Sequence, residues 1–360
     1  MGSVDRKSVQ KGRGAASKPA GRFASTHAEA DDDGWGILEE PLPPLATTVQ
    51  PDASRTIIAR NQSPDIPFTQ SINPYRGCEH GCPYCYSRPT HAYLDLSPGL
   101  DFETRLFYKP DAAQLLKKEL GAPGYECSPI ALGTNTDPYQ PIEREYGVTR
   151  AILEMLSALN HPTTIVTKGA ALIARDIDLL ASMAERNLIA VSISITTLDS
   201  ELKRTLEPRA AGPASRLAAV RKLTEAGVPV GVMVAPVIPV LTDHELESIL
   251  EAAAGAGAKT AGYVMLRLPF EVNALFQEWL RTHAPLKAEH VMARVRELRG
   301  GRDNDPRFGS RMRGEGIYAD LFRKRFEVAC RRYGLNKERR ELDTSRFVPP
   351  AGASPQLSLL

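Results

Sequence analysis

The chain has 360 residues, of which 42% are hydrophobic, and it carries 45 Lys and Arg against 43 Asp and Glu, for a formal net charge of +2. This composition fits one large α/β domain or two modest ones, and the balanced charge argues against both a polycationic nucleic-acid coat and an acidic disordered chain. No apolar run reaches the roughly 18 residues of a membrane-spanning helix, and the polar N-terminus lacks the apolar segment of a secretory signal, so we expect no membrane association.

Composition divides the chain into four segments. Residues 1–45 are rich in Gly, Ala, Ser, Lys and Asp, which predicts a disordered N-terminal arm. The main folded domain is expected over residues 46–283, where short apolar runs alternate with longer amphipathic stretches. A basic helical extension over residues 284–346 and a flexible tail over residues 347–360 complete the expected organisation.

Short apolar runs rich in β-branched residues predict six strands. The first leads through residues 71–73, and the others cover residues 129–133, 163–167, 188–195, 228–234 and 262–268. Amphipathic patterns predict helices over residues 111–120, 148–159, 173–186, 215–226, 243–256, 270–282, 288–298 and 317–333.

This alternation predicts an α/β fold with a parallel sheet, because each strand is followed by a helix that can return the chain to the same edge. Several strands are nearly continuous apolar runs, as expected for strands buried on both faces. Periodicity alone leaves two architectures open, a barrel and an open doubly wound sheet.

Three cysteines stand close together in the motif C-x3-C-x2-C, formed by Cys78, Cys82 and Cys85. Three thiolates on one short loop can hold a [4Fe–4S] cluster and leave one iron without a protein ligand. Zinc is the alternative, with His80 or His91 as the fourth ligand, although zinc motifs more often pair two separate C-x2-C units.

The C-terminal part of the chain is basic. Residues 281–346 carry 18 Lys and Arg against 10 Asp and Glu. Such a segment can attract phosphate or an acidic partner. The alternative is an ordinary solvated helix surface, because the sequence does not place the arginines on one face.

The cysteine loop resembles a known family. With its aromatic residue before the last cysteine, it is similar to the loop of the radical S-adenosylmethionine (SAM) superfamily, and residues 82–86 (CPYCY) resemble the branch of spore photoproduct lyase and its uncharacterised relatives. The resemblance covers about residues 70–270. It extends to motifs after the later strands, namely Thr136-Asp137-Pro138, Thr167-Lys168, Ser194, Glu207, Arg216 and residues 235–237.

The resemblance implies a partial (β/α)6 TIM-like barrel that binds a [4Fe–4S] cluster and SAM. In this superfamily the open iron chelates SAM, and one electron from the cluster cleaves the sulfonium to give a 5′-deoxyadenosyl radical that abstracts hydrogen from the substrate. The protein supplies orientation and a dry site for this chemistry.

The resemblance also assigns site residues. Cys78, Cys82 and Cys85 would hold the cluster, and Tyr84 would cover the adenine and the cluster. The loop that contains Thr136 and Asp137 would receive the SAM ammonium, Lys168 its carboxylate, and hydroxyls on the fourth strand its ribose. Glu207 and Arg216 match family positions, where they bind SAM or pair with each other. The predicted SAM-binding residues are thus Tyr84, Thr136, Asp137, Lys168, Ser192, Ser194, Glu207 and Arg216.

Substrate-side residues are less well defined. Tyr84 and Tyr86 match two tyrosines of the lyase loop and are the candidate catalytic residues. Arg267 at the end of the sixth strand is a candidate substrate contact, because a charge at an apolar strand end needs a partner. The lyase proper has a hydrogen-donating cysteine after its second strand, whereas residues 131–137 contain none and Cys127 precedes the strand. This puts thymine-dimer repair in doubt, but not radical chemistry.

The sequence therefore predicts a radical SAM enzyme of unknown substrate, with nucleic acid as the first candidate. Its implied partner is a one-electron donor of the flavodoxin or ferredoxin type, and an oxygen-labile cluster implies a cytoplasmic location. The alternative is a non-enzymatic iron–sulfur or zinc module that senses redox state or acts as a scaffold.

Overall fold

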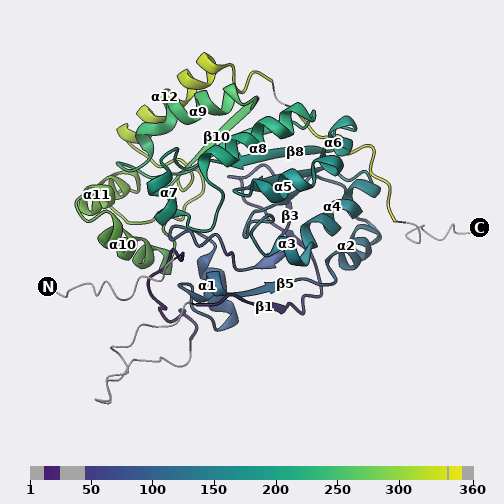
Figure 1. Cartoon of the computed structure of the whole chain (residues 1–360), viewed down its shortest axis with the longest axis horizontal. Helices are drawn as coiled ribbons and strands as arrows, with labels where there is room; N and C mark the ends of the chain where they lie inside the picture. Colours follow the sequence, from purple (N-terminus) through teal and green to yellow (C-terminus); the bar gives the residue numbers. More distant parts are fainter. Residues whose placement is uncertain (1–11, 25–44, 339, 351–360) are drawn as a thin grey trace, which may run out of the picture.

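The main sheet places six parallel strands side by side in the computed structural model, which describes residues 12–24, 45–338 and 340–350 (Figure 1). Its strand order is β10-β9-β8-β7-β6-β3-β2, and the edge strand β2 (Ile58–Arg60) runs antiparallel to β3. The parallel strands are β3 (Gln70–Ile72), β6 (Ile130–Leu132), β7 (Thr163–Thr167), β8 (Ile189–Ser194), β9 (Val230–Val237) and β10 (Thr260–Met265).

These are the six strands predicted from the sequence, and they follow one another in chain order across the sheet. A doubly wound sheet reverses its strand order at a switch point, and no reversal occurs here. The α/β fold with a parallel sheet is confirmed. Because parallel strands end at one edge, the segments that follow them meet there.

Helices connect the strands and cover the sheet (Figure 1). They lie close to the predicted positions for residues 111–120, 148–159, 215–226, 270–282, 288–298 and 317–333. The α-helices are α1 (Asp101–Thr104), α2 (Ala112–Leu120), α3 (Glu143–Tyr146), α4 (Val148–Ala158), α5 (Ala171–Arg175), α6 (Ile177–Glu185), α7 (Ser200–Leu206), α8 (Pro213–Glu225), α9 (Leu246–Gly255), α10 (Glu271–His283), α11 (Ala288–Leu298) and α12 (Ile317–Tyr333), with short 3-10 helices η3 (Arg88–Leu94) and η4 (Asp243–Glu245).

The single helix predicted over residues 173–186 is interrupted at Asp176. Its carboxylate is fully buried and pairs with Arg150 at 3.0 Å and with Arg175 at 2.8 Å. A buried carboxylate held by two arginines fixes the local backbone, so α5 ends and α6 begins there.

A second, three-stranded sheet was not predicted. It has the order β1-β5-β4, formed by β1 (Thr48–Pro51), β5 (Arg105–Tyr108) and β4 (Tyr75–Arg76). Its strands are short and only partly buried, so they lack the apolar runs that identify the main strands. This sheet supports the segment that leads into the cysteine loop.

Buried apolar side chains form two main clusters. The larger lies between the main sheet and its helices and includes Ile72, Ile165 and Val232. The smaller joins the cysteine loop to α10 and α11, because Cys82 and Tyr84 pack in the same group as Trp279 and Val291. The cysteine loop is therefore supported by the helices that follow the main sheet.

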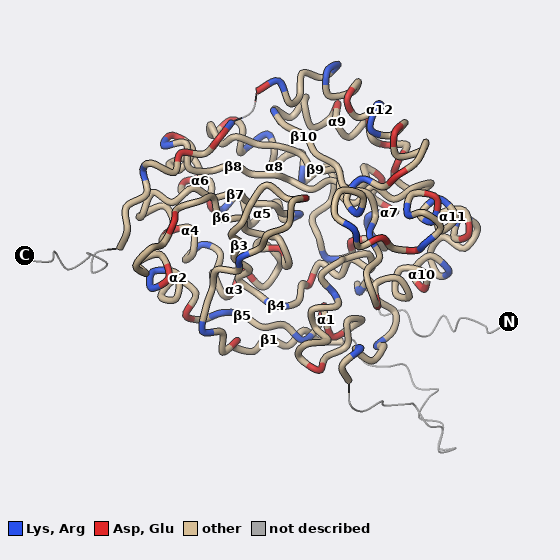
Figure 2. Tube along the Cα trace, turned by 180° about the vertical axis from the view of Figure 1, so that it is seen from behind, with Lys and Arg blue, Asp and Glu red and all other residues tan. Residues whose placement is uncertain are grey.

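The C-terminal extension is helical, as predicted, and α12 packs against α9 (Figure 1). Figure 2 shows acidic and basic residues interspersed along α11 and α12. Several arginines are paired, as in Arg325 with Glu247 at 2.7 Å and Arg296 with Asp303 at 2.7 Å. This pairing favours the interpretation of an ordinary solvated helix surface over that of a phosphate-binding segment.

The described part of the N-terminal arm departs from the predicted disorder. Residues 12–24 pack against the folded domain, and Arg13, Gly14 and Ala15 are buried. Their backbone groups find polar partners inside the protein, a property that a Gly- and Ala-rich composition does not reveal. Three further ranges lie outside the described residues. They are residues 1–11 and 25–44 of the same predicted arm and residues 351–360 of the predicted tail. At the start of that tail, Phe347 packs edge-on against His161.

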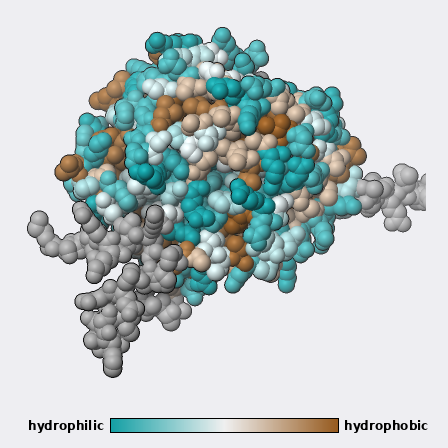
Figure 3. All heavy atoms as spheres, viewed as in Figure 1, coloured by the Kyte–Doolittle hydropathy of each residue, from teal (hydrophilic) through white to brown (hydrophobic). Residues whose placement is uncertain are grey.

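The surface in Figure 3 shows apolar atoms in separate groups between polar ones. Among the helices of the described residues, none combines the length and apolar character that crossing a lipid bilayer requires.

We predict that two buried histidines make stability depend on pH. Burial lowers the pKa of both His91 and His161 to about 4. The unfolded chain therefore binds more protons than the folded one between pH 6.5 and 4, so the free energy of unfolding falls as pH falls through this window. His161 alone accounts for up to about 3 kcal/mol.

Urea unfolding at pH 7 and pH 5 measures this effect. His161→Gln is expected to flatten the pH dependence relative to wild type, and an unchanged slope would contradict the prediction. His290→Gln is the matched control, since this histidine is exposed.

Candidate functional site

The three cysteines lie together on the loop between β4 and η3. Cys78 and Cys82 are 7% exposed, and Cys85 is partly buried. Burial raises the pKa of the Cys78 thiol well above its usual range, and the nearby Asp137, Cys85 and Cys82 add to the effect. The three thiols therefore lie on one short, largely buried loop, and thiolates are ligands that soft metal centres prefer.

Two glycines give this loop its shape. Gly77 and Gly81 have φ of 76° and 70°, in the left-handed region that favours glycine. A Cβ on Gly77 would lie 2.7 Å from the carbonyl oxygen of Phe102, and one on Gly81 would lie 2.5 Å from a carboxylate oxygen of Glu103. The loop is thus packed against α1 too closely for any side chain at these positions.

Two buried polar side chains that the sequence analysis missed hold the loop backbone. Arg88 donates to the carbonyl oxygens of Cys82 and Gly81 at 2.8 and 3.0 Å. Gln140 accepts from the Glu79 amide at 2.8 Å and donates to the Gly77 carbonyl at 3.2 Å. Both are fully buried, so they set the loop geometry rather than contact a substrate. An arginine three residues after the last cysteine was the available signal for Arg88.

The two histidines proposed as zinc ligands have other partners. Nδ1 of His80 faces Asp137 at 3.4 Å, and Nε2 of His91 lies 2.9 Å from the Arg105 carbonyl oxygen. Among the described residues, no three His, Cys, Asp or Glu side chains converge as ligands of one metal ion do. In a four-iron cluster each thiolate binds a different iron, so its ligands need not converge on one point.

Glu207 lies at the centre of a buried polar group. Its carboxylate accepts from the Tyr84 hydroxyl and from Thr196 Oγ1, the latter at 2.7 Å, and it pairs with Arg216. Lys168 Nζ is 4.0 Å from the same carboxylate. The structure thus brings together four residues predicted from the sequence and adds Thr196, whose position two residues after Ser194 was the available signal.

The opposite charges in this group keep one another ionised. Burial on its own raises the pKa of Glu207, but Arg216 and Lys168 outweigh it, and the pKa falls to about 2. Burial lowers the pKa of Lys168, while Glu207 and Cys82 raise it above its usual value. A cationic Lys168 therefore lies beside the cysteine loop, and its Nζ is 5.8 Å from the Tyr84 ring centre.

The Arg216 guanidinium donates its hydrogen bonds to groups inside the protein. Besides Glu207, it donates to the carbonyl oxygens of Ala211 and Ser194, both at 2.9 Å, and it is 1% exposed. Glu207 and Arg216 therefore pair with each other, which was one of the two roles predicted for them.

Asp137 connects two strand ends to the cysteine loop. Its carboxylate accepts from Thr167 Oγ1 at 2.6 Å and from the Lys168 amide at 2.7 Å, and it faces His80. Burial acts to raise the pKa of Asp137, but the His80 ring and these hydrogen bonds lower it to about 2. The neighbouring Thr136 is buried, and its hydroxyl donates to the Tyr75 carbonyl at 3.1 Å.

Ser192 and Ser194 lie on β8, on the face opposite the apolar core. Ile189, Val191 and Ile193 alternate with them and belong to the larger apolar cluster. The two serines therefore share one face of the strand, as the alternation predicted.

Tyr86 and Arg267 meet at the edge of the site. The Arg267 guanidinium lies 5.5 Å from the centre of the Tyr86 ring, and Tyr86 is 48% exposed. Burial lowers the pKa of Arg267, and the neighbouring Arg311 adds to this effect. Cys127 precedes β6 and so lies at the opposite end of that strand from residues 133–137, as predicted.

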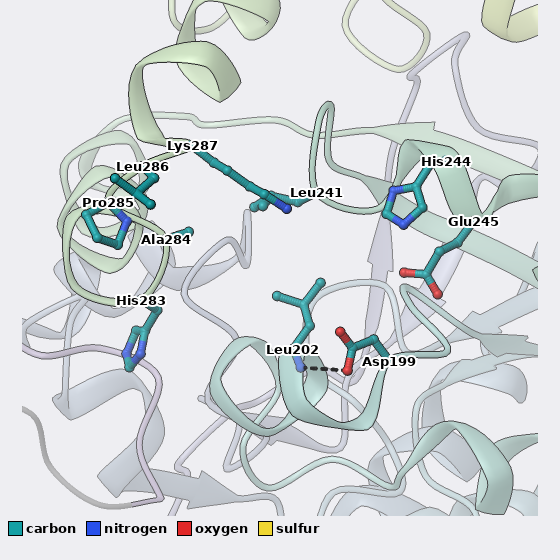
Figure 4. Close-up of a pocket in the computed structure, with 10 residues that line it drawn as sticks. All are labelled: Asp199, Leu202, Leu241, His244, Glu245, His283, Ala284, Pro285, Leu286 and Lys287. Atoms are coloured by element: carbon teal, nitrogen blue, oxygen red, sulfur yellow. Dashed lines mark hydrogen bonds between the residues drawn. The ribbon is translucent and has the colours of Figure 1, made fainter.

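A separate pocket of about 580 Å³ lies between the start of α7, the η4 region and the α10–α11 connection (Figure 4). Figure 4 shows Leu202 and Leu241 between residues 283–287 and the pair His244 and Glu245. None of the predicted site residues lines this pocket. The candidate site is the residue group around the cysteine loop.

Comparison with known proteins identifies relatives over the region that carries this site. Residues 72–253 match a family model described as the radical SAM superfamily. An uncharacterized protein of Mycobacterium tuberculosis is 40% identical over 235 residues, which are 65% of this chain and 68% of that protein. An uncharacterized protein of Acidianus two-tailed virus is 31% identical over 196 residues, which are 52% of this chain and 64% of that protein.

Solved structures of similar fold include variants of spore photoproduct lyase. One superimposes with a TM-score of 0.54 at 19% identity, over 79% of this chain and 77% of that chain. Another, with bound AdoMet and dinucleoside spore photoproduct, gives a TM-score of 0.51 at 18% identity over the same shares. At these identities the likeness concerns the fold.

Proposed function

Because the chain belongs to the radical SAM superfamily, we propose that it is an enzyme that cleaves SAM reductively and abstracts a hydrogen atom from its substrate. The cofactors of the superfamily are a [4Fe–4S] cluster and SAM. The observation that carries the proposal is the largely buried loop that presents Cys78, Cys82 and Cys85, with the Lys168 Nζ nearby at 5.8 Å from the Tyr84 ring centre.

The residues of the site divide this work. Cys78, Cys82 and Cys85 would hold the cluster through their thiolates. When bound, the cluster and SAM supply the one-electron chemistry that generates a carbon radical. Lys168 provides a positive charge suited to the SAM carboxylate, and Glu207 keeps Lys168 charged and Tyr84 in place.

The other predicted SAM contacts remain part of the proposal. Ser192 and Ser194 share the face of β8 opposite the core, which suits contact with the ribose. Asp137 orients the strand ends around the ammonium site, since its oxygens already bind Thr167 and Lys168. We propose that the sheet and its helices form a partial (β/α)6 barrel, a reading supported by the chain-order arrangement of the strands.

Nucleic acid is the substrate class that we propose. The likeness of fold to spore photoproduct lyase and the position of Arg267 beside the half-exposed Tyr86 support it. We do not propose thymine-dimer repair, because residues 131–137 contain no hydrogen-donating cysteine.

A flavodoxin or ferredoxin would supply the electron, in a reducing compartment such as the cytoplasm. The non-enzymatic metal module is not favoured, because the family match covers the whole cysteine and strand-end region.

Formation of 5′-deoxyadenosine tests the proposal. The protein is reconstituted anaerobically with iron and sulfide and then mixed with SAM and dithionite. We expect about four irons per chain and 5′-deoxyadenosine as a product. A protein that neither takes up iron nor binds SAM would contradict the enzyme assignment, and one equivalent of zinc would favour the metal module.

We predict that Arg267 contributes to binding of a nucleic-acid substrate. Replacing Arg267 by Met should weaken the binding of a single-stranded oligonucleotide and reduce the salt dependence of the binding constant by about one phosphate contact. Fluorescence anisotropy at several salt concentrations measures both effects. Arg325→Met, which removes a paired arginine on α12, is the control. Absent or salt-insensitive binding by wild type would contradict the nucleic-acid proposal.

A further inference from the structure

Residues 12–19, here called the strap, cross the outside of the cysteine loop. The backbone amides of Gly14 and Ala15 donate to the two carboxylate oxygens of Glu103 at 3.0 and 2.9 Å. Gly14 lies so close to the loop that a Cβ there would overlap the carbonyl oxygen of Gly81. The strap therefore touches the loop directly, between the first two cysteines of the motif.

The same carboxylate also holds the loop from inside. Arg88 donates to Glu103 at 2.8 Å and, with its other nitrogens, to the carbonyl oxygens of Gly81 and Cys82. Arg88 and Glu103 are fully buried. Glu103 thus couples the strap amides to the arginine that fixes the cysteine loop, and its ion pair with Arg88 does not depend on the strap.

Both ends of the strap are anchored. At one end, Arg13 donates to the Glu103 carbonyl oxygen at 2.9 Å and to Thr47 Oγ1 at 3.0 Å. At the other end, the Ser17 carbonyl oxygen accepts from the Leu100 amide at 3.1 Å, and the Ser17 hydroxyl donates to Glu278 of α10 at 2.6 Å. These contacts hold the strap between the small sheet and α10.

We infer that the strap is a positioning element for the cysteine loop, and that its contact through Gly14, Glu103 and Arg88 keeps the loop closed and controls how fast a bound cluster is lost. This inference rests on the proposed function, in which the three cysteines hold that cluster. The strap lies outside the region matched by the family model, residues 72–253, so it is a feature of this chain beyond the shared domain.

Full-length Gly14→Val tests the inference, because its side chain must displace the strap from Gly81. Ala20→Val is the matched control, since Ala20 is exposed just beyond the strap. Each protein is reconstituted anaerobically, and cluster absorbance is followed after addition of an iron chelator. We expect iron loss about tenfold faster in Gly14→Val, the effect of losing one charge-assisted hydrogen bond, and a wild-type rate in Ala20→Val.

Two further readouts separate positioning from general stability. The electron paramagnetic resonance spectrum of the reduced cluster should change in Gly14→Val, and trypsin should cut after Arg13, which is buried in wild type, while the unfolding temperature of the cluster-free protein stays near that of wild type. Arg13→Ala is a second variant for the case that Gly14→Val does not fold. It should also speed iron loss, and Arg13→Lys should restore most of the wild-type rate.

The outcomes are distinct. Unchanged iron loss and an unchanged spectrum in a variant whose strap trypsin cuts would overturn the inference and leave the proposed function standing. The same holds if Arg13→Ala retains its cluster as wild type does. A wild-type protein that takes up no four-iron cluster would instead overturn the proposed function, and the inference with it.

Discussion

Cys82→Ala is expected to abolish 5′-deoxyadenosine formation. Cys82 is one of three thiolates available to the cluster, and its loss leaves an iron without a protein ligand inside a buried loop. Loss of residues that merely orient metal ligands already costs about 10- to 100-fold, so losing a ligand should cost at least about 100-fold. Iron analysis and chromatographic detection of 5′-deoxyadenosine measure the two effects.

Cys127→Ala is the matched control for this experiment. Cys127 lies before β6, away from the cysteine loop, and should keep wild-type iron content and product formation. If Cys127→Ala lost activity and Cys82→Ala kept it, the assignment of the cluster to the loop would be wrong.

Arg216→Met is expected to destabilise the protein by about 3–5 kcal/mol, because it leaves the Glu207 carboxylate buried without its main cation. Both side chains are at most 1% exposed. Lys168, at 4.0 Å, is too distant to replace the hydrogen bond that Arg216 donates. Urea unfolding of the cluster-free protein measures the change.

The double variant Glu207→Gln/Arg216→Met measures the interaction energy between the two side chains. Removing both charges should cost less than the sum of the single changes, since neither partner is then left as an isolated buried charge. Arg325→Met is the control, since it breaks the half-exposed pair with Glu247 and should cost at most about 1 kcal/mol. Strict additivity of Glu207→Gln and Arg216→Met would contradict the coupling.

The predicted strands and the cysteine motif needed no tertiary information. Residues 163–167 are all β-branched and form β7 with the same bounds, and the periodic patterns over residues 288–298 and 317–333 form α11 and α12. Such signals are local, because burial of one face repeats along the chain at the period of the element. The spacing of the three cysteines is local in the same way.

The partners of charged side chains were beyond the reach of the sequence. The sequence could not show whether Glu207 and Arg216 meet, and in the folded chain they form a buried ion pair. Arg88 and Glu103 looked like ordinary charged residues, yet both are fully buried beneath the cysteine loop. A charge can be buried only where a partner meets it, and that partner comes from another part of the chain.

The strap shows the same division most clearly. Local composition predicted a disordered arm, whereas residues 12–19 are ordered and partly buried although they form no helix or strand. Whether such a segment is ordered depends on acceptors elsewhere, here the carboxylate of Glu103. The sequence by itself determined the six parallel strands of the main sheet, most of the helices and the cysteine motif, whereas the tertiary structure decided which polar groups meet, because those contacts join residues far apart in the chain.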